Sequence, residues 1–242
     1  MQMICAAPPY EEEARQLASR LSLSFISSLP ENETPCLFLD EDGLALTGEG
    51  MTVRGDFTRL LPRLRPDRLR GELLVRAAGK PASDGRPGVD MTAGLGEDSF
   101  LLAAAGHRML LFERDAVICA LLSDALRRAA EVPELADAAG RITLTCDDST
   151  AAVASLSETP AFVYLDPMFP ARQKSGLVKK KFQLLHLLEA PCADESALFT
   201  AALAAQPDKI IVKRPRKAAS LAGRRPGYSF SGKTIRYDCY RL

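Results

Sequence analysis

The sequence predicts an α/β fold in which a mostly parallel sheet carries helices on both faces. Short apolar segments alternate with amphipathic helical segments over residues 88–213, and a glycine turn joins the first such pair. Acidic residues also follow four successive predicted strands: Asp90, Glu113, Asp148 and Asp166. Since parallel strands hold ligands at their carboxyl ends, these acids should share one edge of the sheet.

The first 65 residues are expected to form a small α/β subdomain. Apolar residues at helical spacing behind Pro8-Pro9 predict a helix over residues 10–21. Short strands are predicted at residues 2–6, 24–27, 36–40 and 44–47. The proline-rich residues 62–66 are predicted to link this subdomain to a second domain at residues 66–242.

The second domain should hold the main sheet. Its apolar runs are bounded by turn residues, as is typical of strands buried on both faces. Strands are predicted at residues 88–91, 108–113, 141–146, 161–166 and 209–213, with a closing antiparallel hairpin from 228–231 and 234–241. Helices are predicted at residues 69–78, 97–105, 116–130, 150–156 and 197–205.

The glycine turn after the first of these strands has the features of a nucleotide-binding loop. Gly94 and Gly96 carry no Cβ atom, so the backbone can turn tightly and approach a ligand. The helix that begins near Glu97 presents free N–H groups to that ligand. Glu113 lies about 20 residues further on, the spacing at which such folds place a carboxylate on ribose hydroxyls.

The charges around this turn favour S-adenosylmethionine over a dinucleotide. Ser99 replaces the third glycine of the dinucleotide pattern, and Glu97 and Asp98 would repel a pyrophosphate. Asp90 ends the preceding strand, where a carboxylate can hold a cationic amine. S-adenosylmethionine has no phosphate and carries a cationic ammonium and a cationic sulfonium, so it matches these charges.

A second motif, at residues 164–170, indicates methylation of a base amine. The lone pair of an exocyclic amine is delocalised, and Asp166 can accept an N–H bond and reorient that lone pair toward a methyl donor. Pro167 fixes φ in the turn, and Phe169 can stack on a base that has left its helix or loop. We therefore predict catalytic roles for Asp166, Pro167 and Phe169.

The C-terminal third of the chain is basic although the net charge of the chain is zero. Residues 166–242 hold 15 Lys and Arg against 6 Asp and Glu, which indicates a polyanionic partner. The residues predicted to contact RNA phosphates are Arg172, Lys174, Lys179, Lys180, Lys181, Lys213 and Arg214.

Composition argues against several other classes. No 18-residue apolar run occurs, so a membrane span is not expected. Six scattered cysteines lack a Cys-x-x-Cys pair and only two histidines occur, so we expect reduced thiols, no metal and a cytoplasmic protein.

These motifs together resemble the ribosomal RNA small-subunit methyltransferase J family. The matching segments are residues 90–98, 112–114, 164–170, 174–180 and 212–215. The resemblance implies a class I, Rossmann-like methyltransferase fold with a mostly parallel seven-stranded sheet and a C-terminal antiparallel hairpin. It implies methylation of guanine N2 in bacterial 16S rRNA of the small ribosomal subunit, with S-adenosyl-L-homocysteine as the second product. It also implies cofactor contacts at Glu97, Asp98, Glu113, Arg114, Asp148, Ser149 and Asp166.

Three alternatives stay open on the residues alone. Asp-Pro-x-Phe also serves methylation of adenine amines in DNA or of other RNA bases. An NAD-linked oxidoreductase would share the fold, although Glu97, Asp98 and Ser99 oppose it. A non-catalytic RNA-binding assembly factor could retain the fold without the reaction.

Reversing the charges of Lys179, Lys180 and Lys181 to Glu should weaken RNA binding, because fewer counterions are then released from the phosphates. The slope of log affinity against log salt concentration should become shallower by about two to three units. Filter binding over a range of salt concentrations measures this slope. An unchanged slope and affinity would make these lysines a solvated surface only.

Overall fold

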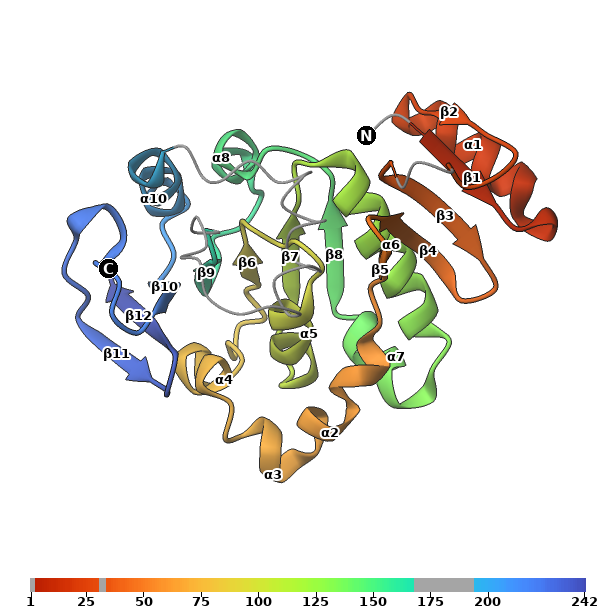
Figure 1. Cartoon of the computed structure of the whole chain (residues 1–242). Helices are drawn as coiled ribbons and strands as arrows, with labels where there is room; N and C mark the ends of the chain where they lie inside the picture. Colours follow the sequence, from red (N-terminus) through yellow and green to blue (C-terminus); the bar gives the residue numbers. More distant parts are fainter. Residues whose placement is uncertain (1–2, 31–33, 168–193) are drawn as a thin grey trace.

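The computed structural model describes residues 3–30, 34–167 and 194–242. Within these ranges the chain forms two sheets (Figure 1). A five-stranded sheet near the N-terminus has the order β2-β1-β3-β4-β5. A seven-stranded sheet has the order β11-β12-β10-β9-β6-β7-β8 and forms the body of the molecule.

The seven-stranded sheet confirms the predicted fold class. Its strands are β6 (Gly88–Asp90), β7 (Met109–Phe112), β8 (Ile142–Thr145), β9 (Phe162–Leu165), β10 (Lys209–Pro215), β11 (Tyr228–Ser231) and β12 (Ile235–Arg241). Val89 is paired with Leu110 on one side and Val163 on the other, both in parallel register. β12 runs antiparallel to its neighbours β10 and β11, as the predicted closing hairpin requires.

Helices cover both faces of this sheet. One face packs on α4 (Leu73–Ala78), α5 (Glu97–Ala104), α6 (Ala116–Ala130) and α7 (Pro133–Ala139), and the other on α8 (Ser149–Ala152) and α10 (Glu195–Ala204). Alternate side chains of β9 serve the two cores: Phe162 and Tyr164 face the first group, and Val163 and Leu165 face the second. This burial on both faces explains the continuous apolar runs in the sequence.

The N-terminal sheet packs on α6, which both sheets share. The strands of this sheet are β1 (Met3–Ala6), β2 (Ser24–Phe25), β3 (Cys36–Asp40), β4 (Gly43–Gly48) and β5 (Met51–Val53). The helix α1 (Glu11–Leu21) packs against them. Val117 and Leu121 of α6 lie in its core, and Asp124 Oδ2 accepts the N–H of Leu44 at 2.9 Å. Phe57 instead stacks on Phe100 of the main core, with ring centroids 4.2 Å apart. The boundary at residue 65 stays a prediction.

Three predicted segments differ from the structure. The proline-rich link forms the short helices α2 (Leu61–Leu64) and α3 (Pro66–Leu69), because proline is compatible with a first helical turn. The helix predicted at residues 69–78 is therefore divided between α3 and α4. The helix predicted at residues 150–156 is α8 followed by a 3₁₀ turn at Val153–Ser155.

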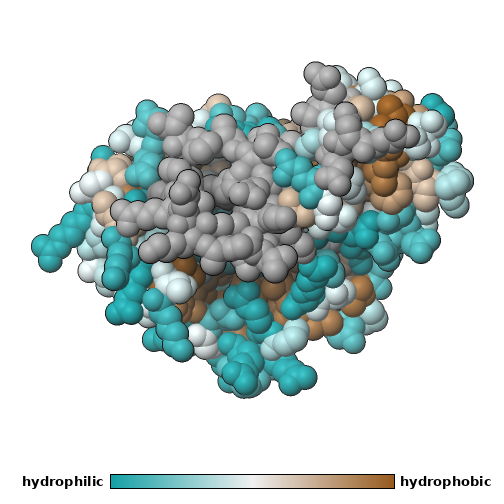
Figure 2. Space-filling model, in the orientation of Figure 1, coloured by the Kyte–Doolittle hydropathy of each residue, from teal (hydrophilic) through white to brown (hydrophobic). Residues whose placement is uncertain are grey.

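The surface seen in Figure 2, outside the residues drawn in grey, is mainly hydrophilic, with hydrophobic side chains gathered on the N-terminal unit at the upper right. No helix in the described ranges is long and apolar enough to cross a membrane. Among the same residues, no group of three or more His, Cys, Asp or Glu side chains is arranged to hold a metal ion.

The cysteines correct the expectation of reduced thiols throughout. Cys119 of α6 and Cys146, directly after β8, form a disulfide with their Cα atoms 5.8 Å apart. Cys5, Cys36 and Cys239 are buried free thiols, and Cys192 lies outside the described residues. The bridge joins two elements 27 residues apart, a separation that carries no motif in the sequence.

Cys146→Ser should lower the free energy of unfolding by about 3 kcal/mol without reductant, because the unfolded chain loses a cross-link. Urea denaturation of the wild type and the variant measures this difference. In excess dithiothreitol the two proteins should unfold at nearly the same urea concentration. Equal stability without reductant would contradict the bridge between Cys119 and Cys146.

Candidate functional site

A chain of hydrogen bonds ties the glycine turn to the ends of β6 and β9. Asp90 ends β6, and its Oδ2 accepts the hydroxyl of Ser99 at 2.5 Å while Oδ1 accepts the N–H of Thr92 at 2.9 Å. Thr92 Oγ1 in turn accepts the N–H of Asp166 at 2.7 Å. The turn, the first turn of α5 and the residue after β9 are therefore fixed relative to one another.

Asp90 lies beneath the turn, and its expected contact with a cationic amine stays a prediction. Its side chain is 1% exposed, and both of its carboxylate oxygens face Thr92 and Ser99. Burial raises the pKa of Asp90 to about 7, because the charged form has lost its water. Asp90 therefore stabilises the glycine turn from the buried side, through its hydrogen bonds with Thr92 and Ser99.

The glycine turn has the backbone geometry that the sequence indicates. Gly94 and Gly96 adopt φ values of +54° and +76°, and a Cβ atom on Gly96 would lie 2.6 Å from Leu122 Cδ1. Glu113 holds this turn against β7: its Oε2 accepts the N–H of Gly94 and its Oε1 the N–H of Asp115, both at 2.9 Å. Burial raises the pKa of Glu113. Each oxygen keeps a second lone pair that can accept a ribose hydroxyl.

The predicted pair after β8 lies at the same edge. Ser149 Oγ donates to the carbonyl of Met91 at 2.8 Å, which joins the end of β8 to the end of β6. Asp148 caps α8, since its Oδ1 accepts the N–H of Thr150 at 2.8 Å. The hydrogen bonds from Thr150 lower the pKa of Asp148. The side chain of Asp148 is exposed, at the same edge as the glycine turn.

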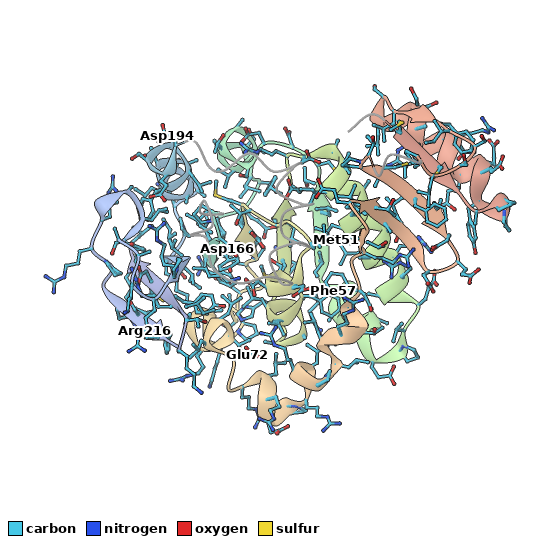
Figure 3. The ribbon with its side chains drawn as sticks, viewed as in Figure 1. Met51, Phe57, Glu72, Asp166, Asp194 and Arg216 are labelled. Atoms are coloured by element: carbon cyan, nitrogen blue, oxygen red, sulfur yellow. A yellow bond between two sulfur atoms is a disulfide. The ribbon has the colours of Figure 1, made fainter. Side chains whose placement is uncertain are left out.

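A bridging ion pair connects three elements at this edge. Lys213 Nζ lies 2.7 Å from Asp98 Oδ2 and 2.9 Å from Asp166 Oδ2. Asp98 Oδ2 also accepts the hydroxyl of Tyr164 at 2.6 Å. Asp166 lies near the middle of the molecule in Figure 3, directly after β9.

Two of the residues predicted to contact phosphates have partners within the chain, and their phosphate contacts stay a prediction. Lys213 is occupied by two carboxylates of its own chain. Arg214 is 5% exposed, its Nη1 lies 3.0 Å from Glu195 Oε1, and its Nε donates to the carbonyl of Ala219. Strand alternation explains this, because neighbouring residues of β10 point to opposite faces of a sheet that is covered on both.

The remaining predicted residues divide into two groups. Glu97 and Arg114 are exposed at the same edge, and Pro167 is buried next to Asp166. The others lie outside the described residues: Phe169, Arg172, Lys174, Lys179, Lys180 and Lys181.

Three residues of the site are absent from the sequence-based prediction. Thr92 and Ser99 are the partners of Asp90, and Tyr164 is a partner of Asp98. The sequence does carry a signal for the bond between Ser99 and Asp90. Ser99 stands at the third glycine position of the dinucleotide pattern, from which its hydroxyl faces back toward Asp90 at the strand end. The partners of Lys213 have no comparable local signal, since they depend on the order of strands in the sheet.

The residues at the carboxyl edge of the seven-stranded sheet offer hydrogen-bonding groups and charges that fit S-adenosylmethionine. Gly94 and Gly96 give the turn its positive φ values, and Glu113 offers lone pairs to ribose hydroxyls. The exposed carboxylates of Glu97 and Asp148 complement a cationic ligand and can accept an amine. When bound, the cofactor supplies an electrophilic methyl group on a sulfonium.

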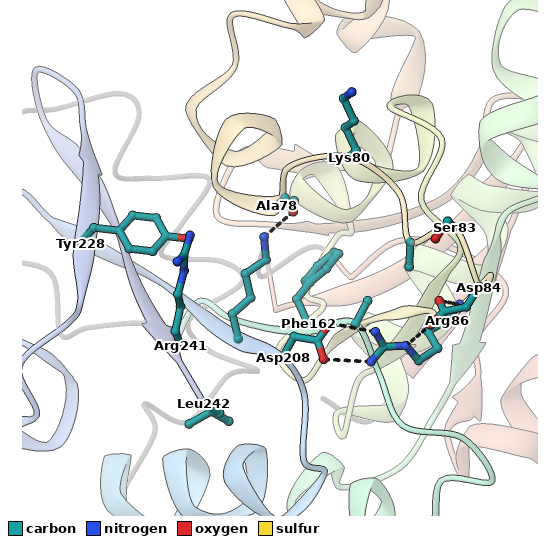
Figure 4. Close-up of a pocket in the computed structure, with 13 residues that line it drawn as sticks. Ala78, Lys80, Ser83, Asp84, Arg86, Phe162, Asp208, Tyr228, Arg241 and Leu242 are labelled. Atoms are coloured by element: carbon teal, nitrogen blue, oxygen red, sulfur yellow. Dashed lines mark hydrogen bonds and ion pairs between the residues drawn. The ribbon is translucent and has the colours of Figure 1, made fainter.

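A cavity at the opposite edge of the sheet has different chemistry. Its volume is about 420 Å³, and its walls include Phe162 and Lys209 at the starts of β9 and β10 (Figure 4). Arg86 there is paired with Asp84 and Asp208. Since ligands of open α/β sheets bind at the carboxyl ends of strands, we place the site at the carboxyl edge and not in this cavity.

Asp90→Asn should reduce the dependence of stability on pH. The pKa of Asp90 is about 7 in the folded protein against 3.8 for the ordinary group, so the folded state holds a proton that the unfolded state has released. The stability contributed by protonated Asp90 is therefore full below about pH 4 and is lost as pH rises through 7. Asparagine can accept the N–H of Thr92 through Oδ1 and donate its amide N–H to Ser99 Oγ, and it does not titrate.

Urea denaturation at pH 4.5 and pH 7.5 tests this prediction. The Asp90→Asn variant should gain stability relative to the wild type at the higher pH, by about 1 to 4 kcal/mol. A difference between the two proteins that is the same at both pH values would contradict the raised pKa of Asp90.

Comparison with known proteins identifies the family of this chain. A family model described as "Putative SAM-dependent methyltransferase" matches residues 16–242. Ribosomal RNA small subunit methyltransferase J of Neisseria meningitidis serogroup C is 39% identical over a 234-residue alignment that covers 95% of this chain and 92% of that protein. The protein of the same name from Alkalilimnicola ehrlichii is 41% identical over an alignment of 254 positions that covers 98% of this chain and 94% of that protein.

A solved structure agrees with these relatives. The crystal structure of a SAM-dependent methyltransferase from Neisseria gonorrhoeae matches with a TM-score of 0.80 at 32% identity, and the match covers 99% of this chain and 96% of that chain. These findings confirm the resemblance, the fold class and the cofactor that the sequence predicts. The chain belongs to the ribosomal RNA small subunit methyltransferase J family of SAM-dependent methyltransferases.

Proposed function

We propose that this chain transfers the methyl group of S-adenosylmethionine to the exocyclic N2 of a guanosine in 16S rRNA. The observation that carries the proposal is the position of Asp166. Its backbone is fixed to Thr92 beside the glycine turn, and its Oδ2 is held by Lys213. Within the described residues, Asp166 Oδ1 has no hydrogen-bond partner, and we assign this oxygen to the base.

The chemistry requires an acceptor at this position. The N2 lone pair of guanine is delocalised into the ring, and a carboxylate that accepts an N2–H bond turns that lone pair toward the methyl carbon. The N–C bond forms as the S–C bond breaks, and the electron pair of the broken bond stays on sulfur. N2 then loses one proton, which Asp166 can accept or pass to water.

Guanine suits a carboxylate better than adenine does. Its Watson–Crick edge presents N1–H and N2–H side by side, and one carboxylate can accept both. Adenine presents an N1 lone pair at that place, which a carboxylate repels. The names of the relatives, which specify ribosomal RNA of the small subunit, support the same substrate.

The proposed partner is the small ribosomal subunit or its RNA, and the proposed compartment is the cytoplasm. The excess of Lys and Arg over residues 166–242 supports contact with a polyanion. The ordered Asp166 position supports catalysis over a purely structural role in assembly, because a binding factor has no need of an acceptor beside a cofactor turn.

Asp166→Asn should reduce methyl transfer by a hundredfold or more, because asparagine presents one donor where the base needs an acceptor. The measurement is transfer of labelled methyl groups to small subunits from cells that lack this methylation, followed by nucleoside analysis. Cofactor binding should stay within a few-fold of wild type. Asp208→Asn, at the opposite edge, is the matched control and should keep full activity.

Two outcomes would contradict the proposal. Wild-type turnover by the Asp166→Asn variant would remove the role of this carboxylate. Label in a nucleoside other than N2-methylguanosine, or no label from the wild type although the cofactor binds, would remove the proposed substrate.

A further inference from the structure

Lys213 forms an ion pair with Asp166, the proposed acceptor. Lys213 follows Val212 on β10, and Val212 pairs with Leu165 of β9 in parallel register. Lys213 and Asp166 are therefore at adjacent positions on neighbouring strands. Its ammonium lies 2.9 Å from Asp166 Oδ2 and 2.7 Å from Asp98 Oδ2. The Lys213 side chain is 26% exposed, so solvent screens these contacts only in part.

The ammonium is held in a surrounding of mostly acidic groups. The titratable groups that face the pair of Lys213 and Asp166 come from neighbouring elements: Asp98 of α5, Tyr164 of β9, Tyr237 of β12 and Asp90 of β6. Arg63 of α2 interacts with Asp98 and Tyr237. Arg63 itself pairs with Glu72, 2.7 Å from Nε to Oε1. Lys213 is therefore the cation that contacts Asp166 directly.

The contact with Lys213 determines whether the carboxylate of Asp166 is ionised, because the other influences on Asp166 oppose ionisation. Burial raises the pKa of Asp166, Lys213 lowers it, and the negative charge of Asp98 raises it again. The two carboxylates hold Lys213 protonated, because they raise its pKa against the effect of burial. If the ammonium were removed, two half-buried carboxylates would face each other without a cation between them.

We propose that Lys213 is a positioning residue that keeps the carboxylate of Asp166 ionised and oriented for the base amine. Its bond to Oδ2 fixes the rotation of the carboxylate and leaves Oδ1 for the amine. Asp98, anchored by the hydroxyl of Tyr164, holds the ammonium in place from the side of α5. The proposal rests on the proposed function for its substrate, but its statement about Asp166 concerns the protein alone.

The role differs from that of a structural ion pair in its dependence on pH. An acceptor carboxylate works only when ionised, so activity should fall as pH drops below the apparent pKa of Asp166. Loss of the Lys213 charge should move this fall to higher pH. A purely structural loss would lower the rate by the same factor at every pH.

The test compares Lys213→Met, Lys213→Arg and wild type by kcat and kcat/KM between pH 5 and pH 9. For Lys213→Met, the pH at which kcat falls to half on the acid side should rise by one unit or more. At acidic pH the variant should then be about tenfold slower than wild type, and the difference in rate should decrease toward pH 9. Lys213→Arg keeps the charge and should restore the wild-type midpoint. Lys209→Met is the matched control, since Lys209 lies on the same strand but donates to the carbonyls of Ala77 and Ala78 at the opposite edge.

A second measurement does not depend on the RNA substrate. Carboxyl ¹³C NMR of aspartate-labelled protein follows the titration of Asp166, whose signal is assigned by its absence from Asp166→Asn. The titration midpoint should rise in Lys213→Met and stay near wild type in Lys213→Arg. If no RNA is methylated but this shift is seen, the proposed substrate fails and the role of Lys213 stands.

Several results would overturn the role of Lys213. One is a Lys213→Met enzyme with the same acidic midpoint as wild type, and another is an unchanged NMR midpoint for Asp166. If Lys213→Met does not fold, Lys213→Gln serves instead: loss of the positive charge should again raise the acidic midpoint, and an unchanged midpoint would contradict the proposal.

Discussion

The parallel register of β6, β7, β8 and β9 is the constraint on which the site depends. It brings four strand ends, each followed by a polar segment, to one edge of the sheet. Hydrogen bonds between these segments then complete the edge: Thr92 joins β6 to Asp166, Glu113 joins β7 to the turn, and Ser149 joins β8 to Met91. The site is thus held by the ends of rigid strands, which limits the freedom of each reacting group.

Charge at this edge is arranged in two layers. The inner layer contains buried Asp90, which holds the turn, and the half-buried bridge of Lys213 between Asp98 and Asp166. The outer layer contains the exposed acids Glu97 and Asp148. A cationic cofactor that lacks phosphate matches the outer layer, and an ionised acceptor beneath it matches the transfer of a methyl group to an amine.

The sequence predicts the sheet because each strand is buried on both faces and is therefore a continuous apolar run bounded by turn residues. It predicts the edge because Asp90, Glu113, Asp148 and Asp166 each follow such a run. It does not predict the partners of Lys213, because the contact between β10 and β9 follows from strand order and not from spacing along the chain. It does not predict that Asp90 is buried beneath the turn, since a strand-end acid points either to the ligand or into the turn, and only the fold distinguishes the two.

The central claim is that the carboxyl edge of the seven-stranded sheet binds the cofactor and presents Asp166 to the base. A crystal structure of the protein with S-adenosylhomocysteine tests this claim most directly. We expect the ribose hydroxyls at Glu113, the amino-acid portion beside the turn at Gly94 and Gly96, and the sulfur facing Asp166. Density for the ligand in the cavity lined by Phe162 and Lys209, or with its sulfur turned away from Asp166, would contradict the account.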